Sequence, residues 1–175
     1  MSSNLAKAAI AALLCQGALG ATVLRLCLQD RADLRMPARA ALIQELIRLF
    51  PSARLSPDCP GDPGALAITL LPQLSGQPSD ALGAMAVRAD GVIAPPILVF
   101  VNAVVAHSSA KSEEALGLAL ARVAGHELLH FLSQSREHSP AGLLQERLSA
   151  ADLTSRSSLG SPQRERTPEP VATAR

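Results

Sequence analysis

Three of the four histidines in this chain fall within one short stretch, whose sequence reads GHELLHFLSQSREH. His126 and His130 are four residues apart, so on a helix they project from one face, one turn apart. Two imidazoles in this arrangement can bind one Zn²⁺, and Glu127 between them can take a proton from a water on the metal. His138 can reach the same ion only if the chain turns back soon after His130. Three protein ligands plus a water form the open coordination of catalytic zinc.

The histidine pair lies in a segment that we expect to be helical from Ser112 to Gln134. Ser112 is the expected N-cap, and two glutamates follow it in the first turn, where the helix dipole favours acidic groups. Apolar residues recur along the segment at a spacing of three to four residues. Pro140 and Gly142 mark the break after the helix. The alternative without a metal is an amphipathic helix that carries two solvated histidines and a surface glutamate.

The motif resembles that of the metzincin clan of zinc metallopeptidases, in which H-E-x-x-H is followed by a third histidine after a glycine. The interval from His130 to His138 is longer than in that clan, and it is similar to that of a group of small secreted bacterial metzincin-like proteins. Their pattern is H-E-x-G-H-x-L-L-G-x-x-x-H-S-x-x-G-I-M, with an acidic–leucine pair a few residues later. This chain matches it from His126 through His138-Ser139 to Gly142, and Asp152-Leu153 supplies the pair.

The resemblance implies that His126, His130 and His138 hold Zn²⁺ and that Glu127 is the general base of peptide-bond hydrolysis. Two departures from the pattern matter for the site. Gln134 stands in place of a glycine, which would ease a left-handed turn. Leu144 stands in place of the methionine beneath the zinc; because leucine has a similar volume, we expect the floor of the site to be kept.

The composition fits one compact domain without tyrosine or tryptophan. Of the 175 residues, 48% are hydrophobic and only three are Phe, so the core must consist of Ala, Leu, Val and Ile. Because no tyrosine can stabilise an oxyanion, zinc or an arginine such as Arg147 would have to do so. A net charge of +1 gives no reason to expect nucleic-acid binding. We expect a monomer that acts on a peptide or protein substrate.

The first 21 residues resemble a secretory signal peptide. Lys7 gives a weakly positive start, residues 8–14 are apolar, and small residues precede a cleavage site before Ala21 or one residue later. The alternative is a buried helix over residues 4–19. A signal predicts that the protein is secreted or periplasmic, and no other segment is predicted to span a membrane. Its removal leaves Cys27 and Cys59, which either form a disulfide or remain free thiols.

The expected fold is α/β (α+β): a twisted mixed sheet of four to five strands with two main helices, zincin-like by resemblance, and a short C-terminal part. One face of the sheet is expected to be covered by both helices. Residues 22–153 form the zinc domain, and residues 154–175 form a tail whose composition predicts disorder. The strand 82–87 is a candidate sheet edge above the zinc, where a peptide could pair with the main chain. Predicted strands are 22–28, 53–56, 65–71, 82–87 and 97–105, and predicted helices are 37–50, 112–134 and one that starts within 149–153.

Three functions are compatible with these patterns. The first is zinc-dependent peptide hydrolysis, with Gln145 and Ser139 as candidate partners of the metal ligands. The second is an exported zinc-binding or interaction module that is derived from a metallopeptidase and has lost turnover. The third is a small α/β interaction domain without a metal. His107, the fourth histidine, precedes the zinc helix and is expected to be a surface residue.

Overall fold

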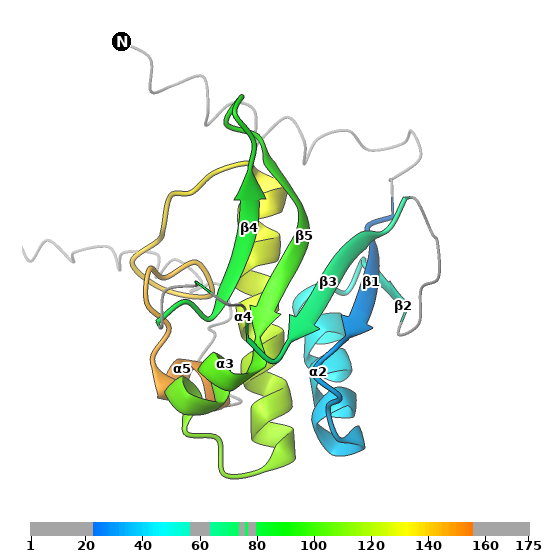
Figure 1. Cartoon of the computed structure of the whole chain (residues 1–175), viewed down its shortest axis with the longest axis vertical. Coiled ribbons are helices and arrows are strands. Elements are labelled where there is room, and N and C mark those ends of the chain that lie inside the picture. The colour runs from blue at the N-terminus through cyan, green and yellow to red at the C-terminus, as the bar shows by residue number, and fades with distance from the viewer. Residues whose placement is uncertain (1–22, 57–63, 74–75, 77–79, 156–175) are drawn as a thin grey trace, which may run out of the picture.

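The computed structural model describes residues 23–56, 64–73, 76 and 80–155. These residues form a mixed five-stranded sheet and four helices, which confirms the predicted fold class (Figure 1). The elements in chain order are β1 (Arg25–Asp30), α2 (Met36–Leu49), β2 (Arg54–Ser56), β3 (Leu66–Leu71), β4 (Gly83–Val87), β5 (Ile93–Phe100), α3 (Val101–Ser108), α4 (Glu113–Ser133) and α5 (Ala150–Thr154).

The strands are ordered β2-β1-β3-β5-β4, and only β4 runs antiparallel to its neighbour. The central parallel strands are rich in Ile, Leu and Val, as is typical of strands buried against other layers. Ile68, Leu70 and Ile97 are fully buried. β4 is an edge strand, as the sequence predicted, so one side of its main chain is not paired within the sheet.

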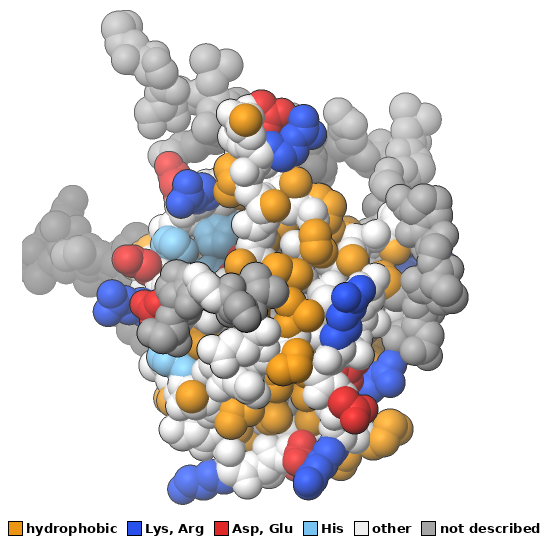
Figure 2. Space-filling model, viewed as in Figure 1, with side chains coloured by type: hydrophobic (Ala, Val, Ile, Leu, Met, Phe, Trp, Pro, Cys, Tyr) orange, Lys and Arg blue, Asp and Glu red, His pale blue; other side chains and the backbone are white. Residues whose placement is uncertain are grey.

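The two long helices cover the same face of the sheet (Figure 1). They cross closely at Gly117 of α4, where a Cβ atom would lie 2.3 Å from the carbonyl oxygen of Ala38 in α2. Only glycine permits this approach. On the opposite face, apolar side chains reach the surface over the strands (Figure 2). The core therefore lies between the sheet and the α2–α4 layer.

The prediction of a single buried strand over residues 97–105 is wrong. β5 begins earlier, at Ile93, and ends at Phe100, after which the chain forms α3. An apolar run of this length is compatible with a strand or a buried helix, and composition does not separate them. In the structure, the buried residues of α3 are Val101, Val104 and Ser108, which recur at the helical spacing of three to four residues.

The remaining elements lie within a few residues of their predicted positions, and the predicted N-cap of α4 is confirmed. Ser112 accepts a hydrogen bond from the main-chain N–H of Ala115 at 3.2 Å. Ser149 and Asp152 form a capping box at the start of α5. Cys27 is disulfide-bonded, whereas Cys59, the signal segment 1–21 and residues 156–175 of the tail lie outside the described residues.

Within the described part of the chain, α4 is long and apolar enough to cross a membrane by length and composition, a property that the sequence analysis missed. In the fold α4 is the core helix, and 61% of its 18-residue apolar window is buried. A mostly buried core helix passes the same test of length and apolarity, so this finding is weak evidence for a membrane span.

A buried ion pair joins α2 to the core helix. The guanidinium of Arg122 in α4 is fully buried, and its Nε donates to Oε1 of Glu45 at 3.2 Å. One terminal nitrogen of Arg122 donates to the carbonyl oxygen of Asp152 in α5. Glu45 also accepts two hydrogen bonds of 2.7 Å from Arg48. This network fixes α5 and α2 on the helix that carries the histidine motif.

Candidate metal centre and its cavities

The three predicted ligands lie together. One nitrogen each of His126, His130 and His138 falls in a group whose members are all within 4.8 Å of one another, so the cluster could hold a metal ion. The ring centroids are 4.6, 5.4 and 5.0 Å apart. His130 is buried, His126 is half-buried and His138 is exposed. Figure 2 shows histidine side chains at the surface beside β4, surrounded by charged groups.

Main-chain carbonyls fix the orientation of both helix histidines. Nδ1 of His126 lies 2.8 Å from the carbonyl oxygen of Leu143, and Nδ1 of His130 lies 2.7 Å from that of Ser135. Because a carbonyl can only accept, each Nδ1 carries the hydrogen. In a neutral ring, Nε2 then presents a lone pair. Carbonyl partners of this kind orient the metal-binding histidines of many proteins.

The two Nε2 atoms face each other at 3.0 Å. Two lone pairs at that distance repel each other unless a cation lies between them. Two nitrogens at 2.0–2.1 Å from a tetrahedral zinc are about 3.3 Å apart, so this pair needs little adjustment. The exposed ring of His138 lies further out and has to move inward. The donor set and its orientation therefore fit a divalent metal ion.

Burial lowers the pKa of His126 below its usual 6.5; the Leu143 carbonyl opposes this shift, and the neighbouring His130 and His138 add to it. The ring is therefore neutral at pH 7, which is the protonation state that a metal requires.

Gln134 makes the turn that brings His138 to the cluster. It adopts the left-handed conformation (φ 49°) that ends α4, at the position where the resembling group has glycine. Its side-chain amide donates to the carbonyl oxygens of Ile93 at 3.1 Å and Phe131 at 2.8 Å, and it accepts from the N–H of Ile93 at 3.0 Å. These bonds compensate for the strain of a non-glycine residue at positive φ.

Glu127 lies against the edge strand. A Cβ atom on Gly83 of β4 would lie 2.9 Å from its Oε1 and 3.0 Å from its Cγ. Burial raises the pKa of the Glu127 carboxyl from 4.5 to about 7. A carboxyl group with a pKa near neutrality can both accept and release a proton at physiological pH.

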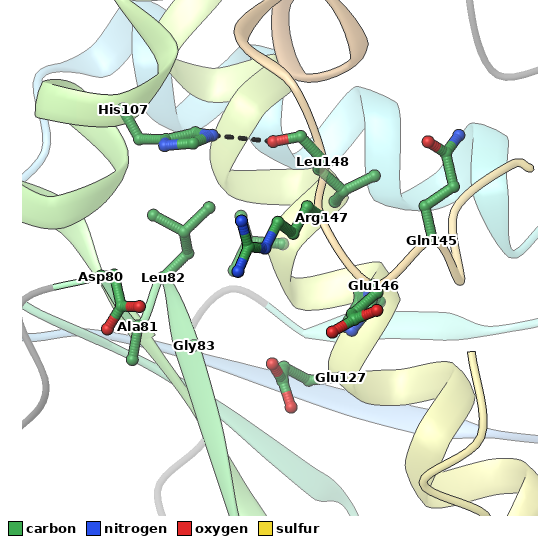
Figure 3. A pocket seen from close by; sticks show the side chains of 12 residues that line it. Asp80, Ala81, Leu82, Gly83, His107, Glu127, Gln145, Glu146, Arg147 and Leu148 are labelled. Atoms are coloured by element: carbon green, nitrogen blue, oxygen red, sulfur yellow. Dashed lines mark hydrogen bonds between the residues drawn. The ribbon is translucent and has the colours of Figure 1, made fainter. Parts of the chain in front are cut away.

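Two cavities meet at His126 and Glu127. The first, of about 510 Å³, is lined by the start of β4, by His107 and by residues 145–148 (Figure 3). The second, of about 350 Å³, is lined by Met85, Val87, Ile93, Arg136 and two of the histidines, His130 and His138. A peptide that lies along β4 would therefore pass the histidine cluster, and its side chains could enter both cavities.

Several partner residues differ from those expected. Within the described residues, the Ser139 side chain forms no hydrogen bond to a histidine; its hydroxyl donates to the carbonyl oxygen of Ala141 at 2.6 Å. Gln145 lines the first cavity and makes no side-chain hydrogen bond to a histidine within the described chain. The true partners are the carbonyls of Leu143 and Ser135, which leave no signature in the sequence because every residue has a carbonyl.

His107 is exposed, as predicted, but its Nε2 lies 2.7 Å from the carbonyl oxygen of Leu148 and its ring lines the first cavity. To place His107 at the cavity from the sequence, residues 101–108 would have to be recognised as a helix, because that helix ends beside the wall of the cavity.

Comparisons with protein-family models, with curated proteins and with solved structures found no match. The resemblance to metzincins therefore stays a prediction, and the function has to be argued from the site itself.

Proposed function

We propose that this chain is a zinc-dependent peptidase in which His126, His130 and His138 hold Zn²⁺ and Glu127 is the general base. The observation that carries the proposal is the contact between the Nε2 atoms of His126 and His130, beside the half-buried carboxyl group of Glu127 on the same helix. Three imidazole ligands would leave one position of the zinc open, as in catalytic zinc sites, and imidazole ligands suit zinc among the divalent metals.

Zinc, when bound, supplies a Lewis acid that polarises the substrate carbonyl and makes a water more acidic. Glu127 takes one proton from that water as the water oxygen bonds to the carbonyl carbon. Glu127 then gives the proton to the amide nitrogen as the C–N bond breaks, so the products are a carboxylic acid and an amine. The unpaired side of β4 would hold the peptide through main-chain hydrogen bonds.

A non-catalytic zinc-binding module is the second candidate, and the absence of tyrosine favours it. Among the described residues that line the first cavity, Arg147 is the one arginine or lysine that could take the place of a tyrosine. If Arg147 does not reach the oxyanion, the site binds zinc without efficient turnover. Under either candidate, export of the protein and a peptide partner remain part of the proposal.

The test is casein hydrolysis by the zinc-loaded protein and by Glu127→Gln, with zinc content measured in both. We expect equal zinc and a loss of at least about a hundredfold in rate for the variant. Equal rates for the two proteins would show that Glu127 is not the base. A zinc-loaded wild-type protein that cleaves nothing would support the binding module instead.

A further inference from the structure

We propose that the first cavity recognises a carboxylate on the substrate and that Arg147 binds it. The proposal rests on the proposed function only for the position of the substrate along β4. Because this cavity shares His126 and Glu127 with the metal cluster, it would take the residue next to the bond that is cleaved.

Arg147 is the one arginine or lysine among the described residues that line this cavity. In Figure 3 its side chain points into the cavity, toward Leu82 at the start of β4. Within the described residues, its guanidinium forms no hydrogen bond or ion pair, although Asp80 and Glu146 line the same cavity. An arginine presents a planar fork of donors that matches the two oxygens of a carboxylate. An entering carboxylate would therefore meet donors that nothing else occupies.

Two acidic residues, Asp80 and Glu146, line the same cavity and would favour a cationic side chain instead. Asp80, Glu146 and Arg147 are all exposed, so water screens the three charges alike. A zinc ion at the adjacent histidine cluster would add positive charge beside the cavity, which favours a carboxylate over a cation.

The main chain that carries Arg147 is held at both ends by histidines. The carbonyl of Leu143 accepts from His126, and the carbonyl of Leu148 accepts from His107 of α3 at 2.7 Å (Figure 3). The Leu148 side chain is buried, which anchors the segment further. Binding by Arg147 therefore requires little ordering of the backbone, which lowers its entropic cost.

Peptide binding to zinc-loaded Glu127→Gln, measured by fluorescence anisotropy, tests the proposal without relying on turnover. Alanine-based peptides with blocked ends carry one central Glu, Gln or Lys. A fourth peptide ends in Gln with a free carboxylate, which separates a chain-terminal source of the carboxylate from a side-chain source. A charged hydrogen-bonded pair contributes about tenfold or more to affinity, so at least one carboxylate peptide should bind that much more tightly than blocked Gln.

Added to this background, Arg147→Gln should bring that ratio close to one, and Arg147→Lys should leave it intermediate. The matched control is Arg136→Gln, which removes the same charge from the second cavity and should leave the ratio unchanged. The proposal is overturned by tighter binding of the Lys peptide, by a ratio that survives Arg147→Gln, by equal loss in both arginine variants, or by no binding of any peptide.

The outcome is independent of whether the wild-type protein is a peptidase. A carboxylate preference that depends on Arg147, without hydrolysis by the wild-type protein, would remove the peptidase and leave the binding site. Hydrolysis by the wild-type protein without that preference would support the peptidase and remove the carboxylate-binding site.

Discussion

The side-chain amide of Gln134 hydrogen-bonds both main-chain polar groups of Ile93, donating to its carbonyl oxygen at 3.1 Å and accepting from its N–H at 3.0 Å. The pair ties the C-terminal end of α4 to the start of β5. Gln134 thereby fixes the point at which the chain leaves the helix and turns toward His138. A residue that departs from the resembling motif is thus a structural part of the site.

Replacement of Gln134 by alanine should destabilise the protein by about 2 kcal/mol, because three hydrogen bonds are lost and the left-handed backbone remains strained. Gln134→Gly loses the same bonds but relieves the strain, so its cost should be about 1 kcal/mol smaller. Urea unfolding of the two variants measures the difference. If Gln134→Gly is as stable as the wild-type protein, the amide contributes nothing beyond compensation for its own backbone.

A methyl group at position 83 should displace Glu127 without affecting the metal ligands. The new Cβ would lie 2.9 Å from Glu127 Oε1 and 3.0 Å from Val123 Cγ1, and the carboxyl group is the more flexible neighbour. We expect Gly83→Ala to lower kcat by about tenfold or more, with zinc affinity unchanged. Steady-state kinetics beside a zinc titration measures both. Unchanged kcat, or joint loss of zinc and activity, would contradict the assigned position of Glu127.

The zinc-free protein should lose stability as the pH rises from about 4.5 to about 7. The pKa of the folded-state Glu127 carboxyl is raised by burial from 4.5 to about 7, so in this range the folded state binds more protons than the unfolded state. The stabilisation is complete below pH 4.5 and is lost once the carboxyl ionises in the folded protein. Thermal unfolding across pH measures it.

Glu127→Gln is the control for this pH dependence, because it keeps the shape of the side chain and cannot ionise. Relative to the wild-type protein, its melting temperature should rise between pH 5 and pH 8, which lie below and above the folded-state pKa of about 7. A constant difference between the two proteins at both pH values would mean that Glu127 is not desolvated.

Loss of the Glu45 charge should be costly because Arg122 is fully buried. Glu45→Gln leaves that guanidinium without its counter-charge, for which we expect about 3–5 kcal/mol of destabilisation in urea unfolding. The matched control is Glu113→Gln. Glu113 pairs at 3.5 Å with Arg35, whose side chain is 81% exposed, so the expected cost there is below about 1 kcal/mol. Similar costs for the two variants would show that burial of Arg122 is not what makes the first pair strong.

Local chemistry in the sequence was sufficient for most of the fold. Ser112 is a cap residue whose hydrogen bond is made within one turn, so its role could be predicted without tertiary information. The i, i+4 spacing of His126 and His130 likewise fixes their common helix face. Strand β4 was predicted as a candidate edge from an order of strands and helices that resembles the metzincin upper subdomain, and it lies at an edge of the sheet.

What the sequence did not reveal depends on contacts between distant segments. The carbonyls of Leu143 and Ser135 orient the histidines, and main-chain groups have no sequence signature. The bond of Gln134 to Ile93 joins residues far apart in the chain, so a departure from the motif could be noted but its compensation could not. Helix α3 was missed because an apolar run alone does not distinguish a helix from a strand.

The most direct test of the metal centre is equilibrium dialysis against zinc followed by elemental analysis, on the wild-type protein and on alanine variants of His126, His130 and His138, with His107→Ala as the control. The three-histidine site predicts one zinc per chain in the wild-type protein and in His107→Ala, and an affinity weaker by about a hundredfold or more in each of the other variants. A wild-type protein that retains no zinc, or a His138→Ala variant with full affinity, would contradict it.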